Sequence, residues 1–293
     1  MGTERLEGGT PRSSYAQLAA DHGLVPQVGR PPFRTYIRDL WASRHFIWAL
    51  STTRTYARNE NTYLGQVWAI LTPLLYAAVY YVIFGQLLGT SKDIENFTAF
   101  LIIGIFVFQL CSGSLSRGGS AIIGNNSMIR SLRFPRAALP ISVVVTEFLT
   151  LLPAIAVMLV IVTLTGEPPT WSWLLIAPMF LLIATFNVGV AMFVARIVAH
   201  SRDVKNLIPF TVQVLRYTSG VFFSIALLVP AEPAATLLHY QPYALSLELI
   251  RGPLLEQFTV SWLEVGVMGG WTLLACVGGL VYFWRGEGKY GID

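Results

Sequence analysis

Two charged residues stand inside apolar stretches of this sequence and are its first candidates for chemistry. Glu147 follows the run ISVVVT, and Arg216 follows the run IPFTVQVL. A charge inside a membrane span costs about 2.5–3.5 kcal/mol on insertion scales, so it is kept where it has a partner or a wet cavity. Three roles are open: a Glu147–Arg216 contact, an Arg216 that faces a channel, and an Arg216 that extends to the lipid headgroups.

Motifs for catalysis, cofactor binding and metal binding are absent from the sequence. It contains no G-x-x-x-x-G-K-[ST] phosphate loop, no H-E-x-x-H, no G-x-S-x-G and no C-x-x-C. Its four histidines are scattered, and Cys111 and Cys276 lie in apolar runs, which argues against a disulfide framework or a zinc site. One intramembrane carboxylate is too few for paired-acid catalysis. We therefore expect no catalytic, cofactor or metal site in this chain.

The elements that position Glu147 and Arg216 must be membrane helices. Hydrophobic residues make up 54% of the 293 residues and charged residues 12%, about half of the roughly 25% charge of soluble domains. The mean hydropathy is +0.58. Such a chain cannot cover itself with polar surface, which excludes a soluble enzyme and, despite a pI near 9.1, a nucleic-acid-binding protein. The sequence predicts an all-α membrane protein.

Six stretches are long and apolar enough to cross about 30 Å of hydrocarbon as helices. The second is the weakest, because Gln109, Ser112, Gly113 and Ser114 dilute its end. A further stretch, residues 231–258, is apolar but broken by prolines, which predicts a re-entrant or interfacial pair of short helices. The six predicted transmembrane helices are residues 67–88, 97–115, 141–165, 173–198, 207–229 and 262–284.

The N-terminal part divides into a tail and an amphipathic segment. Residues 1–34 have no apolar signal-peptide region and are expected to form a flexible cytoplasmic tail. In residues 35–66, apolar and basic side chains alternate at helical spacing up to residue 58, with Arg44, Arg54 and Arg58 among the basic ones. The pattern favours a helix in the membrane interface and a lead-in to the first span. A helix packed on a partner protein fits the same pattern, and both can hold at once.

Positive charge is concentrated on one side of the predicted membrane. Seventeen of the 20 Lys and Arg residues lie in the N-terminal segment, in the loops 116–140 and 196–206, and in the C-terminal tail. Because cytoplasmic loops are rich in these residues, both termini are expected in the cytoplasm. An even number of spans agrees with this orientation.

The loop between the second and third spans predicts a short amphipathic helix at about residues 122–136. Good N-cap residues come first, two apolar residues follow, and arginines flank them: Asn125, Asn126, Ser127, Met128, Ile129, Arg130 and Arg133. Docking of this helix into the groove of a separate energy-supplying subunit, with Met128 and Ile129 buried in that subunit, fits the pattern. A positively charged anchor at the headgroups fits it equally.

The missing motifs favour a pore-forming subunit that depends on another protein for energy. An ion-coupled carrier usually has several intramembrane ionisable groups and an internal repeat, and the sequence has neither. A membrane-bound glycan transferase or ligase, which would need a larger outer domain with clustered polar residues, is one alternative. A structural scaffold is another.

Four ordered stretches resemble the membrane subunits of ABC-2 type polysaccharide exporters, the Wzm and TagG-like permeases. They are RNENTYLGQVWAILTPL with VYYVIFGQL, NNSMIRSLRFPRAALP, SRDVKNLIPF, and QPYALSLELIRGPLL, so the resemblance covers about residues 35–290. Within the family, the chain is most similar to the mycobacterial galactan exporters. It departs from the family in having Asn59 in place of an aromatic residue, Ser-Gly-Val at 219–221 in place of Ser-Pro-Val, and Gln241 in place of Asn. The second departure puts a helix break in the fifth span in doubt, although Gly220 still permits one.

The resemblance implies an assembly in the bacterial cytoplasmic membrane. Two copies of the chain would form a channel, and two copies of a separate Wzt-like nucleotide-binding subunit would bind ATP and Mg. Residues 125–133 would form the coupling helix, and residues 231–258 would gate the outer exit. The 35–58 helix would lie among the membrane lipids and help to receive a polyprenyl-diphosphate-linked polysaccharide.

The resemblance also implies a channel lined by aromatic side chains, on which sugars stack. In this position Arg216 would meet the diphosphate of the substrate. Membrane aromatics also form interfacial belts, so packing is the alternative for each. The expected substrate is galactan for arabinogalactan, with teichoic acid, O-antigen and capsule as alternatives. The channel and substrate candidates are Tyr76, Tyr80, Tyr81, Phe84, Phe106, Phe108, Phe222, Phe223, Arg216 and Glu147.

Overall fold

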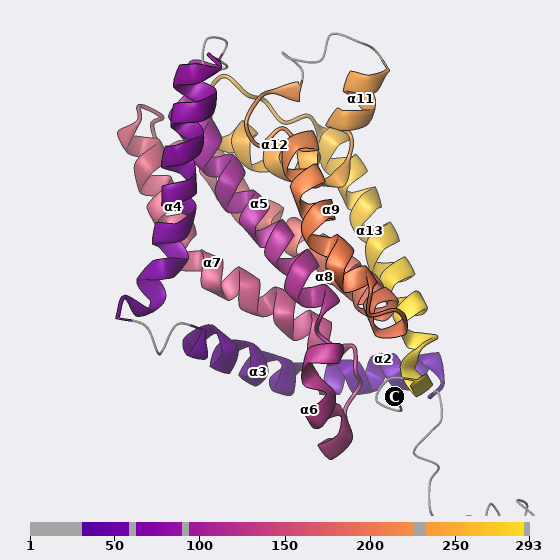
Figure 1. Cartoon of the computed structure of the whole chain (residues 1–293). Helices are drawn as coiled ribbons and strands as arrows, with labels where there is room; N and C mark the ends of the chain where they lie inside the picture. Colours follow the sequence, from indigo (N-terminus) through magenta and orange to yellow (C-terminus); the bar gives the residue numbers. More distant parts are fainter. Residues whose placement is uncertain (1–30, 59–62, 90–93, 226–232, 290–293) are drawn as a thin grey trace, which may run out of the picture.

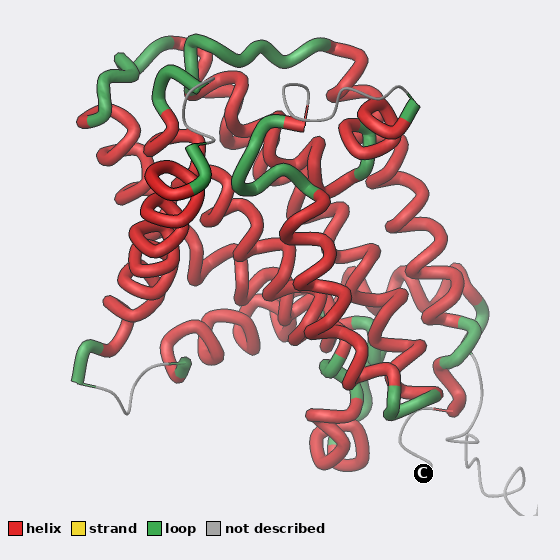
Figure 2. Tube along the Cα trace, turned by 45° about the horizontal axis from the view of Figure 1, so that its top comes forward, coloured by secondary structure: helices red, strands yellow, loops and turns green. Residues whose placement is uncertain are grey.

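All regular elements of the described chain are helices. A computed structural model describes residues 31–58, 63–89, 94–225 and 233–289 (Figure 1), and helices joined by loops make up these ranges (Figure 2). The predictions for residues 1–30 and 59–62 lie outside the described residues. Five helices are long and apolar enough to span a membrane, and they confirm five of the six predicted spans: Trp68–Leu87, Phe97–Gly119, Ala138–Leu164, Trp171–His200 and Trp262–Trp284.

The central helix of the bundle is α5 (Phe97–Gly119). It contacts four long helices and is mostly buried: α4 (Trp68–Tyr80), α7 (Ala138–Leu164), α8 (Ile176–His200) and α9 (Val204–Thr218). Asn96 begins α5, because its side-chain oxygen accepts a hydrogen bond from the amide of Ala99 at 3.1 Å, which satisfies one of the free amides of the first turn.

The first spanning segment, Trp68–Leu87, is largely exposed, in contrast to α5, which is largely buried. Only 11% of its most apolar window is buried, against 83% for α5. α4 ends at Tyr80, and a π-helix over Tyr81–Leu87 extends it to the length of a span. The exposed side of α4 therefore faces lipid or another subunit.

Helix α13 (Trp262–Trp284) packs along α8. Its start is specified locally, because Ser261 and Glu264 form a capping box in which each side chain accepts the other's backbone N–H. The close crossing depends on small residues: a Cβ at Gly279 would collide with the backbone carbonyl of Gly189.

The N-terminal segment forms two helices at the base of the bundle, α2 (Phe33–Ala42) and α3 (Arg44–Ala57) (Figure 1). The prediction of one helix over residues 35–58 is wrong in this respect. The helix breaks at Ser43, whose hydroxyl donates to the carbonyl of Asp39 at 2.8 Å. α3 lies on α7, where the hydroxyl of Ser51 donates to the carbonyl of Ser142 at 3.0 Å.

The fifth predicted span is not one continuous helix in the described residues. α9 ends at Thr218, and Gly220 has φ +72°, a backbone conformation that side chains with a Cβ disfavour. Phe222 then turns inward and is fully buried. The predicted span over 207–229 is therefore interrupted within its described residues, and Gly220 supplies the break that the missing proline left in doubt.

The broken end of α9 is held by Arg251 from α12 (Pro242–Leu254). This guanidinium is fully buried and donates to the carbonyls of Gly220 (2.9 Å) and Val221 (3.2 Å). It pairs with Glu248 at 3.3 Å and stacks on the ring of Phe100. A helix end left without partners in an apolar setting is costly, and α12 supplies the missing donors.

Two short helices occupy the predicted gate region, α11 (Ala234–His239) and α12, which confirms the expected pair of short helices. Figure 1 places them at one end of the bundle, while α2, α3, the short helix α6 (Asn126–Ser131) and the C-terminal end lie at the other. The basic segments predicted for one membrane side therefore share one end of the molecule.

Candidate functional site in a cationic cavity

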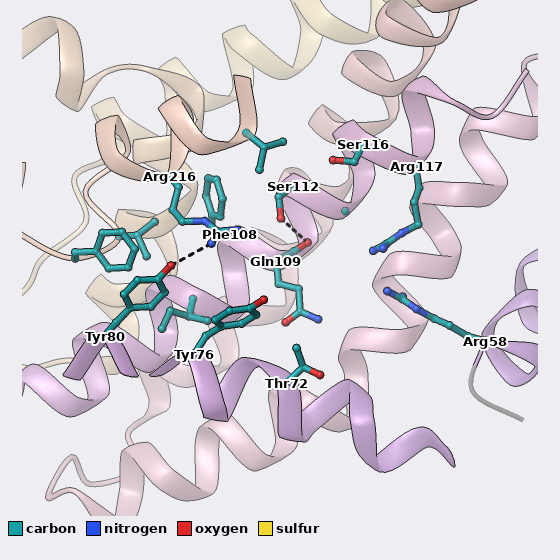
Figure 3. Close-up of a pocket in the computed structure, with 15 residues that line it drawn as sticks. Arg58, Thr72, Tyr76, Tyr80, Phe108, Gln109, Ser112, Ser116, Arg117 and Arg216 are labelled. Atoms are coloured by element: carbon teal, nitrogen blue, oxygen red, sulfur yellow. Dashed lines mark hydrogen bonds between the residues drawn. The ribbon is translucent and has the colours of Figure 1, made fainter. Parts of the chain in front are cut away.

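A cavity of about 340 Å³ lies between α4, α5, α9 and the segment after the α9 break (Figure 3). Tyr76 lines it and is 50% exposed, so the cavity opens to the outside of this chain along α4. The lining residues are Arg58, Thr72, Tyr76, Tyr80, Ile105, Phe108, Gln109, Ser112, Gly113, Ser116, Arg117, Val212, Arg216, Val221 and Phe222.

Each helix presents the cavity with a stripe at helical spacing. On α4 the lining residues are four apart: Thr72, Tyr76 and Tyr80. On α5 they recur three or four apart from Ile105 to Arg117, as expected for one face of a helix. At 1.5 Å per residue this stripe spans about 18 Å along the helix. The cavity is therefore elongated and runs along α5.

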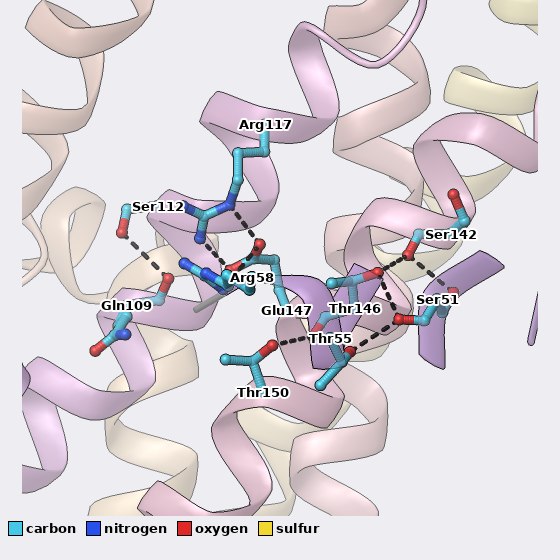
Figure 4. A network of polar contacts seen from close by, with 10 residues as sticks. All are labelled: Ser51, Thr55, Arg58, Gln109, Ser112, Arg117, Ser142, Thr146, Glu147 and Thr150. Atoms are coloured by element: carbon cyan, nitrogen blue, oxygen red, sulfur yellow. Dashed lines mark hydrogen bonds and ion pairs between the residues drawn. The ribbon is translucent and has the colours of Figure 1, made fainter. Parts of the chain in front are cut away.

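One end of the cavity is cationic and held by a shared carboxylate. Glu147, on α7, is 5% exposed and forms ion pairs with Arg117 of α5 and with Arg58 just after α3 (Figure 4). Arg117 donates from Nε and Nη2, one bond to each carboxylate oxygen. Arg58 donates from Nη1 at 3.3 and 3.5 Å. Two positive charges thus share one negative charge.

A glycine makes room for this ion pair. A Cβ at Gly113 would lie 2.5 Å from Arg117 Nη2 and 2.6 Å from Glu147 Oε2. The carboxylate therefore lies directly against the backbone of α5, in a space that only glycine leaves open.

Arg216 lies at the other side of the cavity without a carboxylate partner. Among the described residues, the arginines that form an ion pair with a carboxylate are Arg38, Arg58, Arg117 and Arg251. Arg216 Nη1 donates to the hydroxyl of Tyr80 at 3.3 Å, and its guanidinium lies 5.5 Å from the ring centroid of Phe108. The predicted Glu147–Arg216 contact is wrong, because Glu147 bonds Arg58 and Arg117 instead.

Aromatic rings cluster beside Arg216. The ring of Phe222 lies 4.4 Å from that of Tyr80 and 4.5 Å from that of Phe84, and Tyr76 stacks on Tyr80 at 6.3 Å. Tyr80 and Phe222 line the cavity, whereas Phe84 supports them from behind. The cavity thus has aromatic faces and Arg216 at one end, and the guanidinium groups of Arg58 and Arg117 at the other.

The predicted channel residues fall into two groups. The first lines the cavity: Tyr76, Tyr80, Phe108, Phe222 and Arg216. The second does not: Phe106 is fully buried in the core, Tyr81 packs on Phe97, and Phe84, Phe223 and Glu147 lie behind the lining. The role of each residue in transport stays a prediction.

Sequence reasoning missed the polar stripe of α5. From the sequence alone, Gln109 and Ser112 indicate only a dilution of the second span, and Arg117 only a positive charge in the following loop. Their spacing was the available signal, since positions 109, 112, 113, 116 and 117 fall on one helical face. Arg58 was assigned to the interface helix, yet its guanidinium lines the cavity.

The second candidate site is the region around α6. The residues that are exposed there differ from those that the sequence predicts. Ile129 is 8% exposed and Met128 is half-buried, and both pack on a core cluster that contains Tyr36. Leu132 is 52% exposed, and Ser127, Arg130 and Arg133 are also exposed. The apolar residues expected to protrude therefore anchor α6 to its own chain.

The N-cap prediction for α6 is confirmed in position but not in its hydrogen bond. Asn125 stands at the N-cap position, but its side chain makes no capping hydrogen bond. Its oxygen instead accepts a hydrogen bond from Arg54 Nη2 at 2.7 Å, and its amide donates to the carbonyl of Ala121 at 2.6 Å. Arg54 of the N-terminal segment thus holds the start of α6, while Arg44 lies beside Trp41 on an exposed surface.

Comparison with known proteins identifies the class of this chain. Residues 46–255 match the family described as ABC-2 type transporter. The chain is 26% identical over 206 residues to an O-antigen export system permease protein of Myxococcus xanthus, covering 70% of this chain and 78% of that protein. It is 28% identical over 188 residues to a permease of the same description from Klebsiella pneumoniae, covering 64% and 71%. This chain therefore belongs to the ABC-2 type transporter family, as a multi-pass membrane permease subunit.

Proposed function

We propose that this chain forms the membrane path of an ATP-driven exporter of a lipid-linked polysaccharide. The observation that carries the proposal is the cavity, which joins aromatic faces to guanidinium groups along one helix and opens along α4. Aromatic faces bind sugar rings without fixing them by many polar bonds, which suits a polymer that must slide. The guanidinium groups suit the anionic link between glycan and lipid.

A second copy of the chain completes this path in the proposed assembly. The first spanning segment is largely unburied although one of its faces lines the cavity. A polar cavity that opens toward lipid is unfavourable, whereas two such cavities that face each other form a channel. The proposed orientation has both termini and α6 on the cytoplasmic side of a bacterial cytoplasmic membrane. It agrees with Figure 1, where α2, α3 and α6 lie at the same end of the bundle.

Energy comes from another subunit. ABC-2 permeases pair with ATP-binding subunits in polysaccharide export systems. For this chain we assign the contact to the exposed surface of α6 and the residues after it, Arg130, Leu132 and Arg133. The two apolar residues first chosen for this contact, Met128 and Ile129, support α6 from within the chain, so the contact residue with the most exposed apolar surface is Leu132.

The names of the relatives bear on the substrate. They are described as O-antigen export permeases, which favours an O-antigen-type polysaccharide over the galactan expected from the sequence. Teichoic acid and capsule belong to the same chemical class of lipid-linked glycans. The class rather than one sugar is therefore the proposal.

Complementation tests this function. The chain is produced with its ATP-binding subunit in two bacterial hosts, one lacking its O-antigen permease and one depleted of its galactan exporter. We expect surface polysaccharide to return in the O-antigen host, measured by immunoblot of the cell envelope. Restoration of galactan alone would reverse the substrate assignment, and restoration of neither glycan by a chain that reaches the membrane and binds its ATP-binding subunit would contradict the proposal.

The coupling contact is tested in the same hosts by Leu132→Asp. A charge at this exposed position should abolish a hydrophobic contact with the ATP-binding subunit but leave the fold intact, so export and co-purification of that subunit should both fall at least tenfold. Leu164→Asp, at a leucine that is 80% exposed at the end of α7, is the control. Unchanged export by Leu132→Asp would show that α6 is only an anchor.

A further inference from the structure

The charges around the cavity do not balance. Three guanidinium groups line it, from Arg58, Arg117 and Arg216. Among the described residues, the one carboxylate within 4.0 Å of any of them is that of Glu147. Three positive charges and one negative charge leave a net charge of +2. In a cavity between membrane helices such an excess is costly unless an anion balances it.

Arg216 is the least satisfied of the three arginines. Its Nε is buried and has no hydrogen-bond partner in the described chain. Its one hydrogen bond to another described residue is the 3.3 Å contact from Nη1 to the Tyr80 hydroxyl. Buried guanidinium N–H groups normally have acceptors, so this group is poised to receive an anion on the cavity side (Figure 3).

The other two arginines differ in how firmly Glu147 holds them. Arg58 Nη1 lies at 3.3 and 3.5 Å from the two carboxylate oxygens, and its side chain is 28% exposed. Arg117 is bidentate, and its side chain is 47% exposed on the cavity side. Arg117 can therefore turn toward the cavity while Arg58 stays with the carboxylate and keeps it paired.

We propose that the cavity binds a phosphate-ester dianion between Arg216 and Arg117, with Glu147 as the resident counter-ion that gives up Arg117 when the anion arrives. A diphosphate diester carries two negative charges, which balance the net charge of +2 of the three arginines and Glu147. Arginine forks bind phosphate oxygens in a bidentate way. Gln109, Ser112 and Ser116, on the same face of α5, supply further polar groups between the two arginines.

This proposal rests on the proposed function, since the link between a polyprenyl carrier and its glycan is such a diester. The proposal adds that Glu147 competes with the bound anion for Arg117. Without the anion, Glu147 neutralises Arg117 and keeps the cationic end of the cavity stable. With the anion bound, the exchange of one ion pair for another leaves no arginine unpaired, so the substrate link enters at little net electrostatic cost.

Binding of inorganic pyrophosphate to the purified full-length chain in detergent tests the proposal by titration calorimetry. Arg216→Gln should weaken binding about tenfold or more, because a charge-assisted hydrogen bond is lost. Glu147→Gln should strengthen binding by a similar factor, because Arg117 loses its competitor. Arg202→Gln, which removes the same charge from an exposed turn outside the cavity, should leave binding unchanged.

The sign of the Glu147 effect decides the outcome. Weaker binding by Glu147→Gln, or equal losses in Arg216→Gln and Arg202→Gln, would overturn the proposal. If Glu147→Gln fails to fold, Glu147→Asp takes its place. The shorter side chain keeps the charge but withdraws it from Arg117, so binding should strengthen by a smaller factor, and weaker binding would again count against the proposal.

The source of the anion is distinguished by competition. A polyprenyl diphosphate should displace pyrophosphate, whereas phosphatidylglycerol vesicles at equal phosphate concentration should not, because each headgroup carries one charge. Displacement by phosphatidylglycerol would identify a lipid-headgroup site and overturn the dianion assignment. Pyrophosphate binding with these variant effects in a chain that fails to restore export would contradict the proposed function and leave the anion site standing.

Discussion

At the scale of single residues, two glycines of α5 make space for guanidinium groups. Gly113 accommodates the Arg117–Glu147 pair, and a Cβ at Gly104 would lie 2.6 Å from Arg251 Nη2. Arg117 belongs to α5 itself, whereas Arg251 comes from α12, which packs on α5. The positions of these guanidinium groups thus depend on glycines of α5, which lack a side chain, as well as on the side chains that α5 provides.

Replacing Gly113 with alanine should destabilise the protein. The new methyl group must displace either the carboxylate of Glu147 or the guanidinium of Arg117, and overpacking of this kind costs about 1–3 kcal/mol. The apparent unfolding temperature in detergent measures the effect.

The matched control for this change is Gly278→Ala in α13, where a Cβ would meet no atom within 4 Å. It should leave stability unchanged or raise it by up to about 1 kcal/mol, because alanine favours the helix. Equal behaviour of the two variants would show that the ion pair does not lie against α5.

At the scale of elements, the decisive feature is the end of α9 at Thr218. Gly220 turns the chain, Arg251 satisfies the freed carbonyls, and Gln241 donates to the carbonyl of Thr218. The turn brings Phe222 into the aromatic group beside Tyr80. A straight helix would continue past the cavity, so the break is what builds the cavity's aromatic end.

Gly220→Ala separates a broken from a continuous α9 by the sign of its effect. In the left-handed conformation at φ +72°, alanine should cost about 1–2 kcal/mol. In an unbroken helix the same change would stabilise by about 0.5–1 kcal/mol. Thermal unfolding gives the sign, and Gly124→Ala, at an exposed glycine whose Cβ would meet no atom within 4 Å, should change stability by less than about 0.5 kcal/mol.

The sequence predicted those elements whose signal is local. Apolar runs of about 20 residues located five spans, and prolines between residues 231 and 258 located the short helices. The failures share a physical cause. The turn at Gly220 is stabilised by Arg251, 31 residues further along, and Glu147 found its partners in Arg58 and Arg117, 89 and 30 residues away. Pairings between distant segments depend on packing, which periodicity does not encode.

At the scale of the whole molecule, a polar junction joins the N-terminal helices to the C-terminal end. The hydroxyl of Tyr36, in α2, donates to Glu287 Oε2 at 2.9 Å, and the amide of Arg136, just before α7, donates to Glu287 Oε1 at 2.9 Å. Tyr36 is buried in the same apolar cluster as Ile129 of α6 and Phe283 of α13. The segment expected to bind the ATP-binding subunit therefore shares one core with the N-terminal and C-terminal ends of the described chain.

The junction predicts a pH dependence. Burial raises the pKa of the Glu287 carboxyl, against smaller lowering effects of its hydrogen bonds with Arg136 and Tyr36. The folded chain therefore holds this proton at pH values where the unfolded chain has lost it. The contribution of Glu287 to the free energy of unfolding is greatest below the ordinary carboxyl pKa, near 4.3, and declines as pH rises through the raised pKa.

Glu287→Gln removes this titration. The difference in unfolding temperature between the natural chain and the variant should be most favourable to the natural chain at the acid end of a series from pH 4 to 8, and should shift toward the variant as pH rises. A difference that is constant across the series, or that moves the other way, would contradict the raised pKa. Asp203→Asn, at an exposed turn, serves as the control.

The junction also imposes an order on how the protein is made. Tyr36 and Glu287 are 251 residues apart, and the carbonyl of Pro31 accepts a hydrogen bond from the indole of Trp284 at 2.9 Å. A ribosome releases residue 36 long before it reaches residue 284. During most of synthesis α2 thus has an incomplete docking site, and its apolar side rests on the membrane surface. We expect α2 to reach its final position only after α13 has been inserted, so that the helix translated first within the described chain is among the last to be fixed in place.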